Sequence, residues 1–497
     1  MKMKKNVLIV FWVICLLLSA CGNSGQEAQN SKQLPEESDV ETKTLRVLMP
    51  GSYQDSGIHG PVVQIGGMDV TNEFIYAGLL ELFEEQSGVH VEIDYSYDGL
   101  DNLANQTGRY DLIICTNRSS RVALSSALTA DNCYDMSSLF TEKELYNGDY
   151  VTPILEAGKV EGKQLVFPLT FNLSMLYSSE ESLERHNLNI TTDSSFDELA
   201  ESFMDCWVRE QDTIPLYQMR YGMGNTFGFS SVSPFHTFLY AAENRNHQSP
   251  DFYLKLISLY RSFLEADFNM ELDEIRSWIG QEKTHSIVPV GEQNSLSYTV
   301  DLMMQNNAEE AFDFFNEKIA CFASGTVTGY FIPFAVQSMF YETLYEKAGE
   351  TFFLTAIPEE NNSSGYEAVV TMYGVIPQKA ENPETAFQLL TFLADAKINY
   401  LYDMPVNKNQ IKESLAELKQ RKIQLSSMFG TASCEIGPMS EATADYLESV
   451  IEHIESAGFR DNATEEELYA ILESFVLGEI DEQQAALQMG ELRNPSD

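Results

Sequence analysis

The side chains most able to bind a small molecule stand at the ends of expected β-strands. Five polar or aromatic residues follow the runs 45–49 and 110–115 or separate the runs 164–169 and 173–177. Flat aromatic faces pack against the C–H surface of a sugar, and planar polar groups bond its neighbouring hydroxyls. This set indicates reversible binding of a polyhydroxylated solute, and its members are Tyr53, Asp55, Asn117, Arg118 and Asn172.

A second set of candidates is aromatic. The segment 221–235 (YGMGNTFGFSSVSPF) places aromatic rings among glycines and serines, which suggests a stacking surface. Two further rings stand near expected strand ends. Structural interpretations stay open for both sets, since rings also pack in cores, Asp55 can cap a loop, Asn172 can form a turn and Arg118 can pair with a surface acid. The aromatic candidates are Phe227, Phe229, Phe334 and Tyr373, with Tyr221 and Phe235 beside them.

Patterns typical of catalytic or metal-binding sites are weaker in this sequence than the candidate solute-binding set. Gly222, Gly224 and Gly228 miss the dinucleotide-loop spacing. The run 94–105 opens like a calcium loop, but Asn105 stands where a bidentate Glu is required. None of the seven histidines pairs with another at one helical turn, and no two of the 75 acidic residues stand out as a glycosidase pair. The sequence therefore predicts no catalytic residue, no cofactor and no metal site.

Apolar periodicity predicts alternating strands and helices. Short apolar or alternating runs ended by Gly or Pro indicate strands, and apolar residues three or four apart indicate helices. Such alternation builds a parallel sheet covered by helices. The expected strands are 45–49, 89–93, 110–115, 164–169, 173–177 and 368–376, and the expected helices are 74–85, 196–208, 251–266, 383–401 and most of 441–490.

The charge balance excludes one class of partner. Residues 1–20 hold three lysines and no acids, so the remaining chain has 28 basic and 75 acidic residues and a formal charge of −47. Such a field repels phosphate backbones and anionic lipid headgroups. We therefore expect no nucleic-acid partner and no direct attraction to a membrane surface. The 44% of hydrophobic residues supplies material for one or two cores.

The N-terminus resembles a bacterial lipoprotein signal. A lysine-rich start precedes twelve apolar residues (7–18), and small residues then lead to Cys21. The run is shorter than the roughly 20 residues that cross a bilayer. The resemblance implies cleavage before Cys21 and a diacylglycerol (palmitate-type) anchor on its thiol, with residues 21–44 as a disordered tether. A signal peptide cut nearby, with Cys21 an ordinary cysteine, is the alternative.

Five cysteines remain beyond Cys21. Their wide spacing and the absence of a Cys-x-x-Cys pair argue against zinc or redox chemistry. We expect most of them to be small buried apolar residues, and a single disulfide remains open because the sequence does not choose its partners. They are Cys115, Cys133, Cys206, Cys321 and Cys434.

Seven short segments between residues 45 and 490 carry a family resemblance in their order and spacing. They are FEEQSGVHVEI (83–93), GRYDLIICTN (108–117), EGKQLVFPLTFNLSMLYSSEESLERHNLNI (161–190), SFDELA (195–200), FASGTVTGYFIP (322–333), YGVIPQKAENPETAFQLLTFL (373–393) and VLGEIDEQQAALQ (476–488). Together they resemble the extracellular solute-binding proteins of ABC importers, the group that includes maltodextrin-binding proteins. The loop 51–70 is longer than in many members of this family, and residues 211–320 show little resemblance to the family.

The resemblance implies an α/β, two-lobed periplasmic-binding-protein-like fold. Each lobe would be a mainly parallel sheet flanked by helices, with a hinge and a ligand cleft between the lobes. The first lobe would comprise 45–170 and 366–410, and the second 171–365 and 411–497.

The implied function is non-enzymatic. A monomer tethered outside the cytoplasm by its lipid would capture a solute, most plainly an oligosaccharide, and deliver it to ABC permease subunits. A surface enzyme acting on glycans and a solute sensor for a signalling kinase are the alternatives.

Overall fold

The computed structural model describes residues 43–50, 63–65, 68–70, 72–96, 98–105, 108–116, 123–210, 213–217, 250–268, 270–282, 303, 307–324, 326–327, 330–331, 334–358, 365–396, 404–426, 433–459 and 462–493. The expected signal and all of the expected tether before Lys43 lie outside this part of the chain. The end expected for the tether is wrong by one residue, because Thr44 already belongs to the first strand. Within the described residues, no helix has both the length and the apolarity that crossing a membrane requires.

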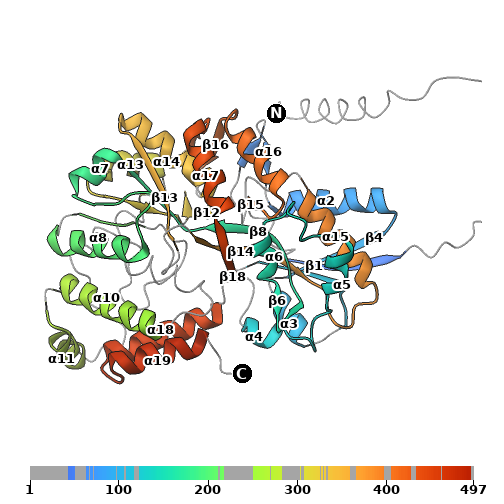
Figure 1. Cartoon of the computed structure of the whole chain (residues 1–497), viewed down its shortest axis with the longest axis horizontal. Coiled ribbons are helices and arrows are strands. Elements are labelled where there is room, and N and C mark those ends of the chain that lie inside the picture. Colours follow the sequence, from blue (N-terminus) through green and yellow to red (C-terminus); the bar gives the residue numbers. More distant parts are fainter. Residues whose placement is uncertain are drawn as a thin grey trace, which may run out of the picture. The chain divides into compact units, whose positions relative to one another are not determined.

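A seven-stranded sheet organises the described chain (Figure 1). Its strands run in the order β15-β8-β14-β5-β1-β4, and β18 pairs with β14 beside this path. The pairs β1·β4, β1·β5 and β14·β18 are parallel, whereas β14·β5, β14·β8 and β15·β8 are antiparallel. The strands are β1 (Thr44–Met49), β4 (His90–Tyr95), β5 (Leu112–Thr116), β8 (Phe167–Leu173), β14 (Tyr366–Val375), β15 (Met404–Pro405) and β18 (Ile454–Phe459).

The long strand β14 joins two parts of this sheet. Its first half, from Tyr366 to Val370, pairs with β18, and its second half, from Met372 to Val375, pairs with β5. Strand β8 runs antiparallel to it on the other side. Both strands are almost wholly buried, as strands covered on both faces must be.

Helices cover the β1·β4·β5 part of the sheet. Helix α2 packs on β4, α3 on β5, and α15 on both β8 and α2. The rings of Phe140, Phe167 and Phe387 meet beneath them, with centroids 5.1–5.8 Å apart. We call this part the first body. Its helices are α2 (Asn72–Ser87), α3 (Gly99–Ala104), α4 (Leu124–Ala127), α5 (Ser137–Glu142), α6 (Thr152–Glu156) and α15 (Pro383–Asp395).

A second, three-stranded sheet has its own aromatic core. Its order is β10-β9-β13, its pairs are antiparallel, and Ile214 and Tyr217 add parallel bridges beside β10. Helix α14 packs on β9 and β13, where Tyr177 and Tyr341 stack at 4.6 Å. We call this part the second body. Its elements are β9 (Met175–Ser179), β10 (Phe322–Ala323), β13 (Phe352–Ala356), α7 (Glu180–Arg185), α13 (Ala308–Phe315), α14 (Phe334–Ala348), α16 (Lys408–Leu418) and α17 (Glu441–Glu452).

A group of long helices packs together, as Figure 1 shows through the labels α8, α10, α18 and α19. Helix α8 begins with a capping box, in which Ser195 and Glu198 satisfy each other's backbone N–H groups. Helix α10 packs against α8, α11 and α19. The bounds are α8 (Phe196–Arg209), α10 (Pro250–Phe268), α11 (Leu272–Glu282), α18 (Asn462–Val476) and α19 (Glu482–Arg493).

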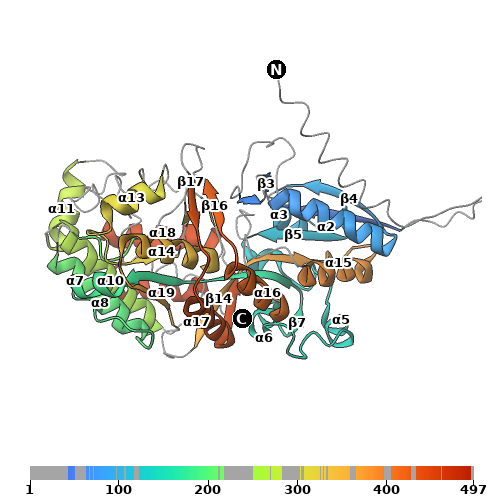
Figure 2. The ribbon, with the colours of Figure 1, turned by 90° about the horizontal axis from the view of Figure 1, so that it is seen from above.

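Short strands complete the fold. A four-stranded sheet has the order β17-β16-β2-β3, and two small hairpins stand apart from it. The strands are β2 (Val63–Ile65), β3 (Met68–Val70), β16 (Ile423–Ser426), β17 (Ser433–Ile436), β6 (Lys159–Val160), β7 (Lys163–Gln164), β11 (Thr326–Val327) and β12 (Tyr330–Phe331). Figure 2 shows β3, β16 and β17 close together.

Two expectations about elements are wrong, and a third is right but misses a strand. The helix predicted over 383–401 ends at Asp395, because Ala396 takes an extended backbone conformation. The region 441–490, predicted as largely helical, also contains strand β18, which pairs with β14 more than 80 residues earlier in the chain. The strand predicted over 164–169 is divided between β7 and β8.

Candidate functional site

Three parallel strands of the first body end at one edge. Met49 of β1 lies beside Tyr95 of β4, and Leu48 of β1 lies beside Ile113 of β5. Carboxyl ends of parallel strands form the usual ligand-binding edge of an open α/β sheet. Tyr53 and Asp55 follow β1, and Asn117 and Arg118 directly follow β5, but these four residues lie outside the described residues. The structure thus shows that strands β1 and β5, which precede these residues in the sequence, end at the same edge of the sheet.

Asn172 lies at the end of β8 and touches the start of α14. Its Oδ1 accepts the backbone N–H of Leu173 (2.9 Å) and that of Phe334 (3.3 Å). The second bond satisfies one of the N–H groups that a helix start leaves unpaired. Asn172 thus has a structural contact, and its Nδ2 amide has no partner among the described residues. A half-buried amide of this kind can still donate to a hydroxyl.

Phe334 opens helix α14 with its ring in the core. The side chain is 0% exposed and packs against Phe171, with centroids 6.2 Å apart. Its carbonyl accepts hydrogen bonds from Tyr177 (3.3 Å) and Ser338 (2.7 Å). In this conformation the ring contacts protein atoms, so it can reach a solute only if its surroundings move.

Tyr373 lies in the second half of β14, opposite Cys115 of β5. Its ring is 2% exposed and meets Phe459 edge-on at 5.0 Å. Tyr373 and Asn172 lie on neighbouring strands, since β14 pairs with β8 along its length. The structure therefore brings Asn172 and Phe334 into contact, and it buries Tyr373 in the sheet. Phe227, Phe229, Tyr221 and Phe235 lie outside the described residues.

The cysteines are buried and unpaired. All five that follow Cys21 are free, as the expectation of small apolar residues required, and none forms the disulfide that the sequence left open. Burial raises the pKa of Cys115, Cys133, Cys206 and Cys434 to about 12. Burial also raises the pKa of Cys321. A thiol with so high a pKa stays protonated at neutral pH and is a poor nucleophile.

The carboxylate of the weak calcium-loop match has protein partners. Asp94 Oδ2 accepts hydrogen bonds from Arg109 (2.6 Å) and from the Tyr110 hydroxyl (3.0 Å). Burial, together with this contact to a carboxylate, raises the pKa of Tyr110. Asp94 therefore forms an ion pair with Arg109, which lies shortly before β5.

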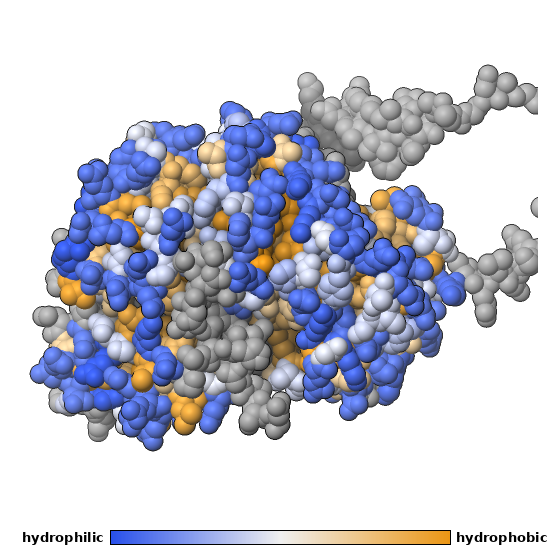
Figure 3. Space-filling model, in the orientation of Figure 1, coloured by the Kyte–Doolittle hydropathy of each residue, from blue (hydrophilic) through white to orange (hydrophobic). Residues whose placement is uncertain are grey.

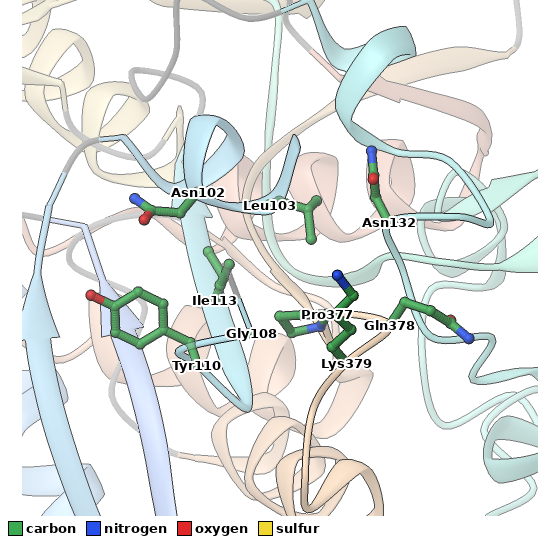
Figure 4. Close-up of a pocket in the computed structure, with 9 residues that line it drawn as sticks. All are labelled: Asn102, Leu103, Gly108, Tyr110, Ile113, Asn132, Pro377, Gln378 and Lys379. Carbon is green, nitrogen blue, oxygen red and sulfur yellow. The ribbon is translucent and has the colours of Figure 1, made fainter. Parts of the chain in front are cut away.

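A small pocket opens at the opposite edge of the sheet (Figure 4). Leu103, Ile113 and Pro377 form its apolar wall, and the side chain of Lys379 reaches its rim. Its empty space is about 270 Å³, and part of this space is open to solvent. Tyr110 and Gly108 border the amino end of β5, so this pocket is separate from the carboxyl edge.

Sequence reasoning missed the role of Asp111. Its carboxylate is 1% exposed and accepts three backbone N–H groups, from Arg46 (2.9 Å), Glu381 (2.9 Å) and Asn382 (3.1 Å). Asn382 is the N-cap of α15, whose own side chain makes no capping bond. Asp111 therefore joins β1, β5 and α15, three segments far apart in the sequence. The only sign of this role in the sequence was a single acidic residue directly before an apolar run.

The visible surface is mostly hydrophilic. Figure 3 shows hydrophilic residues over much of the described part, with apolar patches between them. This agrees with a chain that holds 75 acidic and 31 basic residues.

Comparison with known proteins identifies the fold. No protein-family model and no curated protein matches the chain. Among solved structures, the sugar-binding protein MalE from Xanthomonas citri is similar at 14% identity and a TM-score of 0.51, over 90% of this chain and 96% of that one.

A second solved structure gives the same result. A putative oligosaccharide periplasmic-binding protein from Synechococcus sp. MITs9220, in complex with zinc, is similar at 13% identity and a TM-score of 0.50, over 91% of this chain and 98% of that one. The expected fold class is thereby confirmed: the chain has the two-domain α/β fold of the extracellular solute-binding proteins.

Proposed function

We propose that this protein is a solute-binding protein that captures a sugar, most plainly an oligosaccharide, and delivers it to an ABC permease. It performs no chemistry on the solute. Binding would favour a closed arrangement of the two domains, because a solute held by both domains binds that state more tightly than the open one.

One observation carries this proposal more than any other. Strands β1, β4 and β5 are parallel and in register, so their carboxyl ends meet at one edge. The residues that follow β1 and β5 include an aromatic ring, an acid, an amide and a guanidinium, namely Tyr53, Asp55, Asn117 and Arg118. These groups suit the apolar faces and paired hydroxyls of a sugar. The similar proteins are described as binding sugars or oligosaccharides.

The second domain would supply the opposite wall of the site. We assign residues 45–170 and 366–410 to the first domain and 171–365 and 411–497 to the second. Phe227 and Phe229 are proposed to stack on the solute from the second domain. Asn172, at the passage between domains, would donate from its Nδ2 amide.

The anchor and the permease rest on the N-terminus and the family resemblance. Lipidation of Cys21 would hold the protein at the extracytoplasmic face of the membrane as a monomer. Cell fractionation of a Cys21→Ser chain tests this. Release of the folded protein is expected, and continued membrane association would contradict the anchor.

The function is tested by thermal unfolding of the purified protein with a panel of solutes. The panel contains maltose, maltotriose, cellobiose, xylobiose and raffinose, with amino acids and short peptides as matched non-sugar controls. We expect at least one sugar to raise Tm in a concentration-dependent way. Stabilisation by a non-sugar alone would contradict the proposed substrate class. Chromatography of each sugar after incubation must return it unchanged, because turnover would instead support a glycan-acting enzyme.

A further inference from the structure

A short hairpin after the first strand reaches across to a distant part of the chain. Strands β2 and β3 pair antiparallel with each other, and β2 also pairs antiparallel with β16. In that second pairing Val63 lies opposite Leu425, and Gln64 lies opposite Gln424. About 360 residues of sequence separate the partners. We call the two paired strands β2 (Val63–Ile65) and β3 (Met68–Val70) the strap.

One end of the strap is tied to the first body. Only Thr71 separates β3 from helix α2, which begins at Asn72. Helix α2 packs against β4 and α15, which belong to the first body. A single residue spans less than about 4 Å, so β3 cannot move far without α2.

The other end pairs with a hairpin tied to the second body. Strands β16 and β17 form four register pairs, and β17 packs against α14. Just beyond β17, the Gly437 N–H donates to Thr343 Oγ1 (2.9 Å). The Ser440 N–H donates to Glu342 Oε2 (3.1 Å), and Glu342 is 5% exposed. Thr343 and Glu342 both lie in α14, so the β16·β17 hairpin is fastened to that helix.

We propose that the strap is a latch between the two domains, and that the β2·β16 pairing must break before the domains separate and a solute is exchanged. The latch consists of two register pairs, far fewer than the ladder of β8 and β14 that also links the domains. A short ladder at the edge of a small sheet opens more readily than a long buried one. The control of solute exchange by the latch rests on the proposed function.

A designed disulfide tests the latch in one chain. Gln64→Cys and Gln424→Cys place two thiols at directly opposed positions, whose Cα atoms in an antiparallel pair lie about 4.5–5.5 Å apart. Asp69→Cys with Gln424→Cys is the matched control. Asp69 lies opposite Gln64 in the next strand, about 10 Å from Gln424, too far for a disulfide. The native Cys434 lies opposite Leu425 and so points to the other face from position 424.

Both variants are made in the full chain carrying Cys21→Ser and are compared oxidised and reduced. We expect the 64/424 disulfide to form in most molecules by intact mass, and the 69/424 disulfide not to form. Small-angle scattering without any solute should give a smaller radius of gyration for the oxidised 64/424 protein than for its reduced form. Absence of the 64/424 disulfide, or equal radii in the two redox states, would overturn the latch.

The solute measurement separates the latch from the proposed function. With the panel sugar that gives the largest Tm shift, release should slow at least about tenfold on oxidation of the 64/424 protein. Unchanged release would overturn control of exchange by the latch. If no panel sugar binds even the reduced protein, the proposed function fails, while disulfide yield and scattering still decide whether the latch exists.

Discussion

Asp111 shows how one buried residue positions the candidate site. It lies just before β5, the strand that leads to Asn117 and Arg118, and it binds the backbone of β1, which leads to Tyr53 and Asp55. It also binds the N-terminus of α15, where the helix dipole favours a negative charge. The two strands and the helix are thus held together through one carboxylate.

Removal of that carboxylate should destabilise the protein. Asp111→Ala leaves three backbone N–H groups without their acceptor, and we expect the free energy of unfolding to fall by at least about 2 kcal/mol in a urea titration. Asp273→Ala is the matched control, because the Asp273 side chain is 91% exposed and, among the residues that the structure describes, pairs only with Arg276. Equal stability losses in the two variants would show that Asp111 does not join the segments.

We expect substitutions of the aromatic candidates to have one of two effects, a loss of solute affinity or a loss of stability. Phe227→Ala should weaken solute binding by about 1–3 kcal/mol with little loss of stability, as expected of a ring that stacks on the solute. Phe334→Ala should instead lower the free energy of unfolding by about 3–5 kcal/mol, because its ring is fully buried. Titration calorimetry and urea unfolding measure the two effects. A Phe227 variant with normal affinity and reduced stability would assign that ring to the core.

Glu210 gives a pH-dependent prediction. Burial alone would raise its pKa, but hydrogen bonds with His186, Thr213 and Arg209 outweigh burial and lower it below 4.5. A carboxylate with a lowered folded-state pKa stabilises the fold above its unfolded pKa and loses this effect as the pH falls through its folded pKa. Glu210→Gln should therefore be less stable than the natural chain at pH 7, and the difference should shrink below about pH 4.5.

The exposed Glu271 supplies the control for this experiment. In urea unfolding at pH 7, Glu271→Gln should differ from the natural chain by only a small amount, because the residue is exposed. A Glu210→Gln difference that stays constant between pH 7 and pH 3 would contradict the role of the ionised carboxylate.

At the level of elements, close contacts around one glycine fix the turn before β8. A Cβ on Gly158 would stand 2.1 Å from the Val166 carbonyl oxygen and 2.5 Å from Gln164 Nε2. The backbone cannot move away from so close a contact. We therefore expect Gly158→Ala to lower the free energy of unfolding by about 1–3 kcal/mol, measured by thermal or urea unfolding. Gly78→Ala in helix α2 meets nothing within 4 Å and should stabilise by up to about 1 kcal/mol. The same sign for both variants would contradict the packing around Gly158.

Elements with a local pattern could be predicted from the sequence. The amphipathic run predicted over 196–208 is α8 (Phe196–Arg209), and the buried strand predicted over 45–49 is β1 (Thr44–Met49). Strand β18 was missed because its six residues gain their stability from β14, a partner far along the chain. The strap was missed for the same reason, since β2 has only three residues and pairs with β16.

The candidate site could be predicted only in part. The alternation of strands and helices predicted a parallel sheet that contains β1, β4 and β5, so the edge that leads to the polar residues could be predicted from the sequence. The burial of Phe334 and Tyr373 was not, because a ring in a core and a ring on a binding surface have the same sequence signature. Asn172 shows both interpretations at once, since it caps α14 and keeps an amide group available.

For the whole molecule, two domains linked by β8 and β14 are the arrangement that lets one solute be held from two sides. The fold is that of solute-binding proteins. The net negative charge of the chain repels phosphate backbones. The proposed latch would add to this scheme a contact that opposes separation of the domains.

Hydrogen exchange with and without a bound sugar tests the central claim most directly. Amides within 51–62 and 117–122, which follow β1 and β5, should gain protection in the presence of the sugar that raises Tm most. Amides around the small pocket, at 102–113 and 377–379, should not change. Protection confined to that pocket, with none after β1 and β5, would contradict solute binding at the carboxyl edge of the sheet.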